Sequence, residues 1–272
     1  MQISGLFFGV LFGGVLAAVI FQLQRHAQRN SAMYTTAFRK HVVQGPKSRS
    51  AIVIGATGAT GRQVLQQLLD SDEWGKITTF GRRPPLSGPH EKLSHHTVEN
   101  FDDLETTVEH WAGHDIVFHC IGTTRGQAGG AEPFYKIEVE YTRKVATIAS
   151  DSGIKAFSVV TARGADPTVS RVDWFHPMLY THSLGMKEEV IKEQKGLLRI
   201  SIFRPGMLNR LTGDRTWEVV VNTLGLGIRV DLLAQAMIYD AETEPVPKNG
   251  EREMVHVYEG NTLITQLANS KM

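Results

Sequence analysis

Three glycines spaced three residues apart, Gly55, Gly58 and Gly61, can bring a main chain close to phosphate groups. They follow the apolar run 51–54, and 64–69 then carries valine and leucine on one helical face. A dinucleotide pyrophosphate needs this order of strand, glycine turn and helix, because helix-end N–H groups must point at it. We therefore predict dinucleotide binding rather than a merely structural turn. The residues predicted to bind the pyrophosphate are Gly55, Thr57, Gly58, Ala59, Thr60 and Gly61.

Two arginines follow the next apolar run, 77–80, as Gly81-Arg82-Arg83. An NAD-binding protein usually carries an acidic residue here for the ribose 2′-hydroxyl. Guanidinium groups instead pair with phosphate through two hydrogen bonds, so Arg82 and Arg83 predict NADP(H) as the cofactor. The alternative is a solvated basic loop.

A polar loop follows the apolar run 116–120, and its Gly122 and Thr123 are predicted to contact the cofactor. Ligands of open parallel sheets bind at the carboxyl ends of the strands, where this loop must lie. Cys120 ends the run and is expected to be a packed side chain rather than a nucleophile, because a mid-strand thiol is usually buried and inert.

Short apolar runs alternate with amphipathic stretches along the rest of the chain, which is typical of β–α units. We therefore predict an α/β fold over 50–272, a doubly wound, mostly parallel sheet of the Rossmann type. The net charge of +1 argues against a nucleic-acid partner, which usually requires a concentrated basic face. A single cysteine excludes an intrachain disulfide, and the histidines and carboxylates show no metal-ligand spacing, so no metal is predicted.

The N-terminal segment differs in character, because residues 3–23 contain no charged side chain. Such a run can cross a hydrocarbon core of roughly 30 Å as a helix. No basic stretch precedes it, so a membrane anchor over 1–24 is favoured over a cleavable signal peptide. Residues 25–49 are predicted to be a linker. Basic residues follow the span and none precede it, which predicts a single-pass protein with its folded domain in the cytosol, on the mitochondrial outer membrane or the endoplasmic reticulum.

Several motifs together resemble the Tat-interacting-protein oxidoreductase-like family, atypical members of the short-chain dehydrogenase/reductase superfamily. The matching segments are the glycine turn, Gly81-Arg82-Arg83, 122–126, the helix over 138–149, Gly164-Ala165, Lys187-Glu188-Glu189 and 203–206. The resemblance covers about 50–265 and implies a Rossmann fold with NADPH along the strand ends. It also implies that Pro205 and Gly206 turn over the nicotinamide end, although these residues would equally suit a simple strand-ending turn.

Superfamily enzymes carry Tyr-x-x-x-Lys on a helix and a serine at the preceding strand end. Aligning Lys187 with that lysine puts Ser183 in the tyrosine's place, and Thr161 or Ala162 in the serine's. A serine hydroxyl is a much weaker acid than a phenol, so Ser183 is a poor proton donor for carbonyl reduction. By the same resemblance Lys187 is expected to bind the nicotinamide ribose.

Tyr180 is the candidate substitute, because positions 180, 183 and 187 share one helix face. The distance along the helix argues against this role, since seven residues separate Tyr180 from Lys187 by an axial rise of about 10.5 Å. A break near Gly185 would change this register. The predicted catalytic set is therefore Thr161, Tyr180 and Lys187, with Tyr180 alternatively a packing residue.

Two functions remain open. One is an NADPH-dependent oxidoreductase acting on an unidentified carbonyl compound, with the cofactor supplying hydride. The other is a catalytically inactive NADP(H) sensor or scaffold, whose partner is another protein. The family resemblance is compatible with both, because its members are known for regulatory and protein-binding roles as much as for a defined reaction.

Overall fold

The computed structural model describes residues 48–210, 227–248, 251 and 253–270. The predicted anchor over 1–24, and the predicted linker up to residue 47, lie outside these described residues. Within them, none of the helices has the length and apolar character needed to span a bilayer.

A seven-stranded sheet forms the centre of the folded unit, and every pair of neighbouring strands is parallel. The strands, in spatial order, are β3 (Leu93–Thr97), β2 (Trp74–Gly81), β1 (Arg49–Ile54), β4 (Ile116–His119), β5 (Ala156–Val160), β6 (Arg199–Arg204) and β9 (Met254–Glu259). The predicted α/β fold of the Rossmann type, with a parallel sheet, is confirmed.

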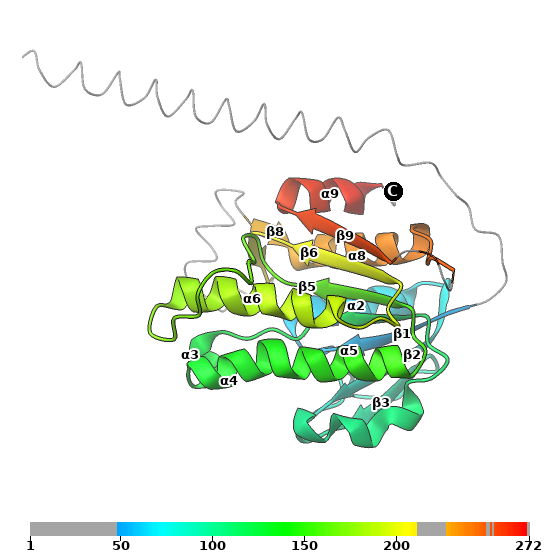
Figure 1. Ribbon diagram of the computed structural model, residues 1–272. Helices are drawn as coiled ribbons and strands as arrows, with labels where there is room; N and C mark the ends of the chain where they lie inside the picture. Colours follow the sequence, from blue (N-terminus) through cyan, green and yellow to red (C-terminus); the bar gives the residue numbers. More distant parts are fainter. Residues whose placement is uncertain (1–47, 211–226, 249–250, 252, 271–272) are drawn as a thin grey trace, which may run out of the picture. The chain divides into compact units, whose positions relative to one another are not determined.

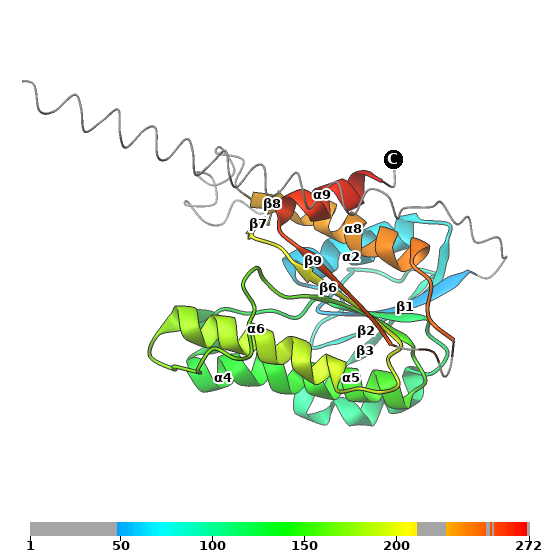
Figure 2. The same cartoon turned by 45° about the horizontal axis from the view of Figure 1, so that its top comes forward.

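Helices cover both faces of this sheet (Figures 1 and 2). On one face lie α2 (Ala59–Asp70), α8 (Val230–Thr243) and α9 (Asn261–Asn269); on the other lie α5 (Tyr141–Asp151), α6 (His176–Lys192) and the 3-10 helix η1 (Phe101–His110). The sequence of β1 is apolar at successive positions because both faces of this strand are covered by helices. Ala51 and Val53 pack into the core under α2 and α8, whereas Ile52 and Ile54 pack into the core under α5 and α6.

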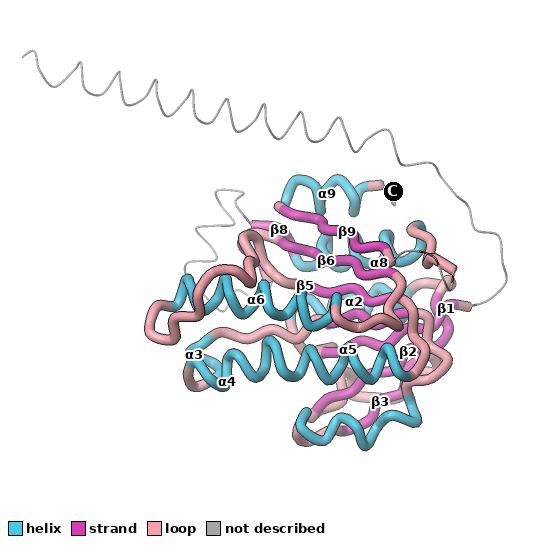
Figure 3. Tube along the Cα trace, viewed as in Figure 1, coloured by secondary structure: helices cyan, strands magenta, loops and turns pink. Residues whose placement is uncertain are grey.

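Shorter elements lie beyond the carboxyl ends of the strands, on the same side as the long loop before α6 (Figure 3). They are α3 (Arg125–Ala128), α4 (Ala131–Tyr135) and the two paired strands β7 (Met207–Asn209) and β8 (Gly227–Arg229). One wide π-helical turn, η2 (Lys136–Glu140), joins α4 to α5. Such turns are frequent at functional sites.

The crevice between β1 and β4 is the place where a ligand is expected. After β1 the chain enters α2 on one face, and after β4 it passes through α4 and η2 into α5 on the other. The two connections diverge, so the carboxyl ends of these strands are left open between them.

Gly185 allows the loop before α6 to lie directly on the helix. A Cβ atom there would stand 2.1 Å from Pro167 N and 2.2 Å from the carbonyl carbon of Asp166. We expect Gly185→Ala to lower the free energy of unfolding by about 1–3 kcal/mol, because the added methyl overpacks this contact. Denaturant unfolding measures the change. Gly126→Ala in α3, where a Cβ would meet nothing within 4 Å, is the control and should not destabilise the protein; equal destabilisation by both variants would contradict the contact.

Candidate functional site

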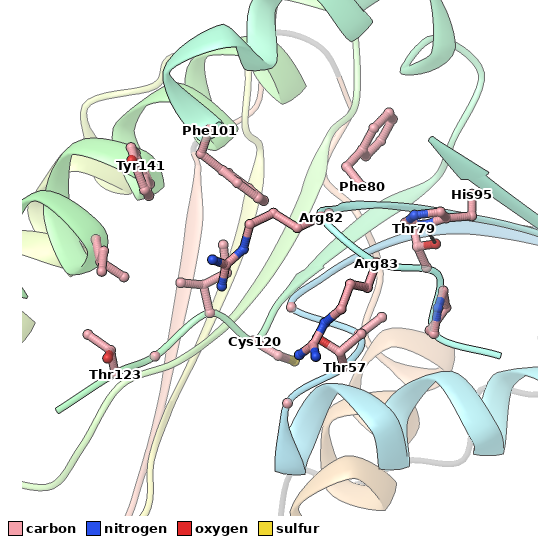
Figure 4. A pocket seen from close by; sticks show the side chains of 18 of the residues that line it. Thr57, Thr79, Phe80, Arg82, Arg83, His95, Phe101, Cys120, Thr123 and Tyr141 are labelled. Carbon is pink, nitrogen blue, oxygen red and sulfur yellow. Dashed lines mark hydrogen bonds between the residues drawn. The ribbon is translucent and has the colours of Figure 1, made fainter. Parts of the chain in front are cut away.

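A cleft of about 430 Å³ lies at the carboxyl ends of β1, β2 and β4 (Figure 4). Several residues predicted from the sequence line it together: Gly55, Thr57, Gly58, Arg82, Arg83, Gly122 and Thr123. Segments from three different strand ends, far apart in the sequence, therefore meet in one cavity, as the strand order requires.

The glycine turn fits tightly between β4 and α2. Gly55 has a φ of +82°, and a Cβ on it would lie 2.8 Å from the carbonyl carbon of Cys120. A Cβ on Gly61 would lie 2.2 Å from Gly55 O. Only glycine satisfies both approaches, and the left-handed φ adds a second reason at Gly55.

The helix α2 begins at Ala59 with its first N–H groups toward this turn. Gly58 occupies the N-cap position and supplies no side-chain hydrogen bond to the helix. Thr60 and Gly61 follow in the first turn and are buried. The end of α2 thus offers main-chain donors and the positive end of a helix dipole, the combination that binds phosphate.

Arg82 and Arg83 are exposed at the end of β2 and both line the cleft. Figure 4 shows Arg83 extending toward Thr57 and Arg82 toward Phe101. Neither guanidinium has a hydrogen-bond or ion-pair partner within the described part of the chain, although the Glu99 carboxyl also lines this cavity. The two arginines therefore provide a pair of cations beside the glycine turn.

Lys187 lies under the loop that follows β4 and is only 1% exposed. Its ammonium group donates to Ile121 O at 2.6 Å and to Glu138 Oε2 at 2.9 Å. Glu138 is 2% exposed, and its Oε1 accepts the Thr123 N–H at 2.7 Å. Two of the three ammonium donors of Lys187 are thus used within the protein.

Thr161 belongs to a different buried network. Its hydroxyl donates to Glu188 Oε1 at 2.8 Å. The guanidinium of Arg204 donates to both oxygens of Glu188, at 2.8 Å and 2.6 Å, which holds the pKa of Arg204 above its usual range despite burial. Thr161 is therefore oriented by a carboxylate that is itself paired with a cation.

Tyr180 lies in an aromatic group rather than beside Lys187. Its ring stacks on Phe134 with 6.2 Å between centroids, and His176 meets it edge-on at 5.8 Å. Burial, together with the charge of Glu138, raises the pKa of Tyr180 to about 12. The break considered near Gly185 is absent, because α6 runs unbroken from His176 to Lys192.

Pro205 and Gly206 form the turn after β6. Arg163 N donates to Pro205 O at 2.9 Å, and Gly206 N donates to Asn261 Oδ1 at 2.8 Å. Neither residue lines the cleft, and neither do Thr161, Tyr180 and Lys187. The structure thus brings Gly55, Thr57, Gly58, the two arginines and the loop after β4 together in one cavity. It leaves these five residues outside that cavity, together with Ala59, Thr60 and Gly61 of α2.

Two buried carboxylates, Glu138 and Glu188, were not singled out from the sequence. Each is at most 2% exposed and pairs with a cation from a distant segment. The available signal was a charged residue between apolar neighbours, as in Ile137-Glu138-Val139. A buried charge is rare unless paired, so such a position points to a partner elsewhere.

No group of three or more histidine, cysteine or carboxylate side chains suited to a metal ion occurs among the residues that the structure describes.

The family model for NAD(P)H-binding proteins matches residues 55–238. The chain therefore belongs to the NAD(P)H-binding family, and the predicted family resemblance is confirmed.

Curated relatives come from animals and fungi. Protein HTATIP2 of Rattus norvegicus is 34% identical over 60% of this chain, and the match spans 64% of the rat protein, slightly under two thirds. Protein fmp52-2, mitochondrial, of Aspergillus terreus is 30% identical over 66% of this chain and 78% of its own. Protein FMP52-1, mitochondrial, of Scheffersomyces stipitis is 30% identical over 75% and 88%.

Solved structures share the fold at low sequence identity. MoeE5 in complex with UDP-glucose and NAD superposes with a TM-score of 0.56 at 12% identity, over 78% of this chain and 86% of its own. WbmH of Bordetella bronchiseptica in complex with NAD+ gives a TM-score of 0.58 at 15% identity, over 82% and 81%. At these identities the likeness concerns the fold alone.

Cys120 provides a test of the environment at the floor of the cleft. Burial raises the pKa of its thiol to about 12. At pH 8 only about one molecule in ten thousand then carries the reactive thiolate. We expect iodoacetamide to leave the native protein essentially unlabelled at pH 8 and to label the denatured chain fully, as measured by intact mass. Labelling of the native protein at the rate of a free thiol would contradict this environment.

Proposed function

We propose that the cleft binds NADP(H) rather than NAD(H). The observation that carries this proposal is the pair of unpartnered guanidiniums, Arg82 and Arg83, at the end of β2. A 2′-phosphate is the group that distinguishes NADP(H), and arginine pairs with phosphate through two parallel hydrogen bonds.

The main chain of the glycine turn fits the pyrophosphate of the same ligand. Added Cβ atoms would fill the approach at Gly55 and Gly61, and the N-terminus of α2 has no side-chain cap. Gly58 and Thr57 would hold the phosphates through backbone N–H groups, with Gly122 and Thr123 on the opposite wall.

The activity that we propose is reduction of a carbonyl compound. Bound NADPH supplies a hydride to the carbonyl carbon. Tyr180 is the proposed donor of the proton to the carbonyl oxygen, and Lys187 a residue that binds the cofactor ribose. Thr161 is the proposed hydroxyl that orients this oxygen, which requires it to exchange its hydrogen bond to Glu188 for one to the substrate. A phenol held at a pKa of about 12 keeps its proton throughout the neutral range.

A second candidate is a cofactor sensor or scaffold without catalysis. Ser183 stands where superfamily enzymes carry tyrosine, and its hydroxyl is fully buried without a hydrogen-bond partner among the described residues. A hydroxyl so enclosed does not reach a substrate. In this version NADP(H) binding changes the affinity of the chain for another protein.

We also propose that the segment 1–24 anchors the protein in a membrane, with the folded domain in the cytosol. The uncharged run 3–23 and the basic residues that follow it support this topology. The word mitochondrial in the names of the fungal relatives favours the mitochondrial outer membrane over the endoplasmic reticulum.

The arginine pair is tested by comparing cofactors. Arg82→Ala and Arg83→Ala should each weaken NADPH binding by roughly tenfold or more, because a charge-assisted hydrogen bond to the 2′-phosphate is lost. NADH lacks that phosphate, so its affinity should stay the same. Calorimetry of the full chain in detergent measures both, and Lys76→Ala, which removes a cation from the other end of β2, is the matched control. Equal losses for NADPH and NADH would contradict 2′-phosphate recognition.

Catalysis is tested by following NADPH absorbance with panels of aldehydes and ketones. Tyr180→Phe should slow any turnover by about a hundredfold or more, because the proton donor is removed. Tyr135→Phe, which removes a hydroxyl in the neighbouring α4, should not. Since the pKa of Tyr180 is raised to about 12, its contribution to the rate should be constant at neutral pH and fall only as the pH approaches that value. Tight NADPH binding without any turnover favours the sensor, and turnover unchanged in Tyr180→Phe rules out this proton donor.

A further inference from the structure

The loop that follows β4 is held from below by two charged side chains of opposite sign. Lys187 Nζ donates to Ile121 O at 2.6 Å, and Thr123 N donates to Glu138 Oε1 at 2.7 Å. The two side chains join each other through a 2.9 Å ion pair. The main chain is therefore fixed immediately before and immediately after Gly122.

The two members of this pair come from different helices. Glu138 lies on the π-helical turn η2, and Lys187 lies on α6. Ile137, the residue before Glu138, lines the cleft, as do Gly122 and Thr123. The pair thus links the cleft wall formed by η2 to the wall formed by the loop.

Burial of both charges is difficult to explain by stability alone. Lys187 and Glu138 are 1% and 2% exposed, so both have lost nearly all contact with water. An apolar pair of similar volume often stabilises a protein as well or better than a buried ion pair. What an apolar pair cannot supply is a donor for Ile121 O and an acceptor for the Thr123 N–H.

We infer that Glu138 and Lys187 act as one positioning clamp, which sets the Ile121–Thr123 main chain for the dinucleotide. Glu138 is the ion-pair partner of Lys187 and comes from a different helical segment, η2. Glu138 is a positioning residue, because it acts through the loop and through Lys187. The inference rests on the dinucleotide site proposed above.

Calorimetric NADPH titrations of the full chain in detergent test the clamp. Glu138→Gln and Lys187→Met should each raise the Kd by about tenfold or more, because the loop loses its fixed position. The double variant should be no weaker than the weaker single variant, since either change already opens the clamp.

Asp240→Asn is the matched control for Glu138→Gln. Asp240 on α8 is another fully buried carboxylate, and its Oδ1 accepts a 2.6 Å hydrogen bond from the Tyr258 hydroxyl. Its neutralisation should lower the melting temperature but change the NADPH Kd by less than about twofold, because it does not contact the loop. A loss of affinity in Asp240→Asn equal to that in Glu138→Gln would reduce the effect to general destabilisation and overturn the clamp.

The outcomes separate the clamp from the cofactor site. If the wild type binds NADPH and the Kd of Glu138→Gln lies within about twofold of the wild-type Kd, the cofactor site is supported and the clamp is refuted. Wild type that ignores NADPH refutes the site, and the clamp with it.

Hydrogen exchange on the wild type covers the case in which the variants do not fold. The Thr123 amide should exchange about a hundredfold or more slowly than in an unfolded chain, because Glu138 accepts its proton. Unprotected exchange at Thr123 in the free protein refutes the clamp.

Discussion

The close contact of three backbone segments at Gly55 determines the geometry of the whole cleft. Gly55 directly follows β1 with a positive φ and lies against the main chain of Cys120, which follows β4. A Cβ on Gly61 of α2 would lie 2.2 Å from the carbonyl oxygen of Gly55. Neither glycine has room for a Cβ, so the end of α2 approaches the sheet edge as closely as a backbone can. The separation of β1 from β4, the direction of α2 and the opening between them all follow from this contact. A larger side chain would tilt α2 and turn its N–H groups away from the cavity.

The side chain that contacts Lys187 on α6 decides whether this part of the site can donate a proton. A tyrosine beside a lysine can release a proton, because its phenol is an acid whose pKa the ammonium lowers. The carboxylate of Glu138 is a hydrogen-bond acceptor when ionised, and it has no proton to give. A catalytic proton therefore has to come from another group. The pKa of Tyr180, the phenol proposed for this role, is raised by burial and by the charge of Glu138. Cofactor binding does not require a proton donor, which is why binding without turnover is a coherent alternative.

The parts of the site that could be predicted from the sequence are those encoded locally. The glycine turn is recognisable because strand, turn and helix are contiguous, and Arg82 and Arg83 because they follow directly on the next strand. The pairing of Lys187 with Glu138 was beyond such reasoning, since the two residues are 49 positions apart and meet only when η2 and α6 pack together. The continuity of α6 through Gly185 was also hidden: glycine weakens a helix on its own, but here the packing of 166–167 against it compensates.

Charge is distributed unevenly between the two sides of the cleft. At the end of β2 the two arginines face the cavity with one nearby carboxylate, Glu99. Beneath the loop that follows β4 the charge of Lys187 is matched at 2.9 Å by Glu138, so this wall of the cleft presents no net charge to a ligand. A molecule with phosphate groups at one end and an uncharged or cationic ring at the other is thereby oriented before any specific contact forms. Glu138 neutralises Lys187 and both hold the loop through the Thr123 N–H and Ile121 O, so the arrangement would favour one orientation of the proposed dinucleotide.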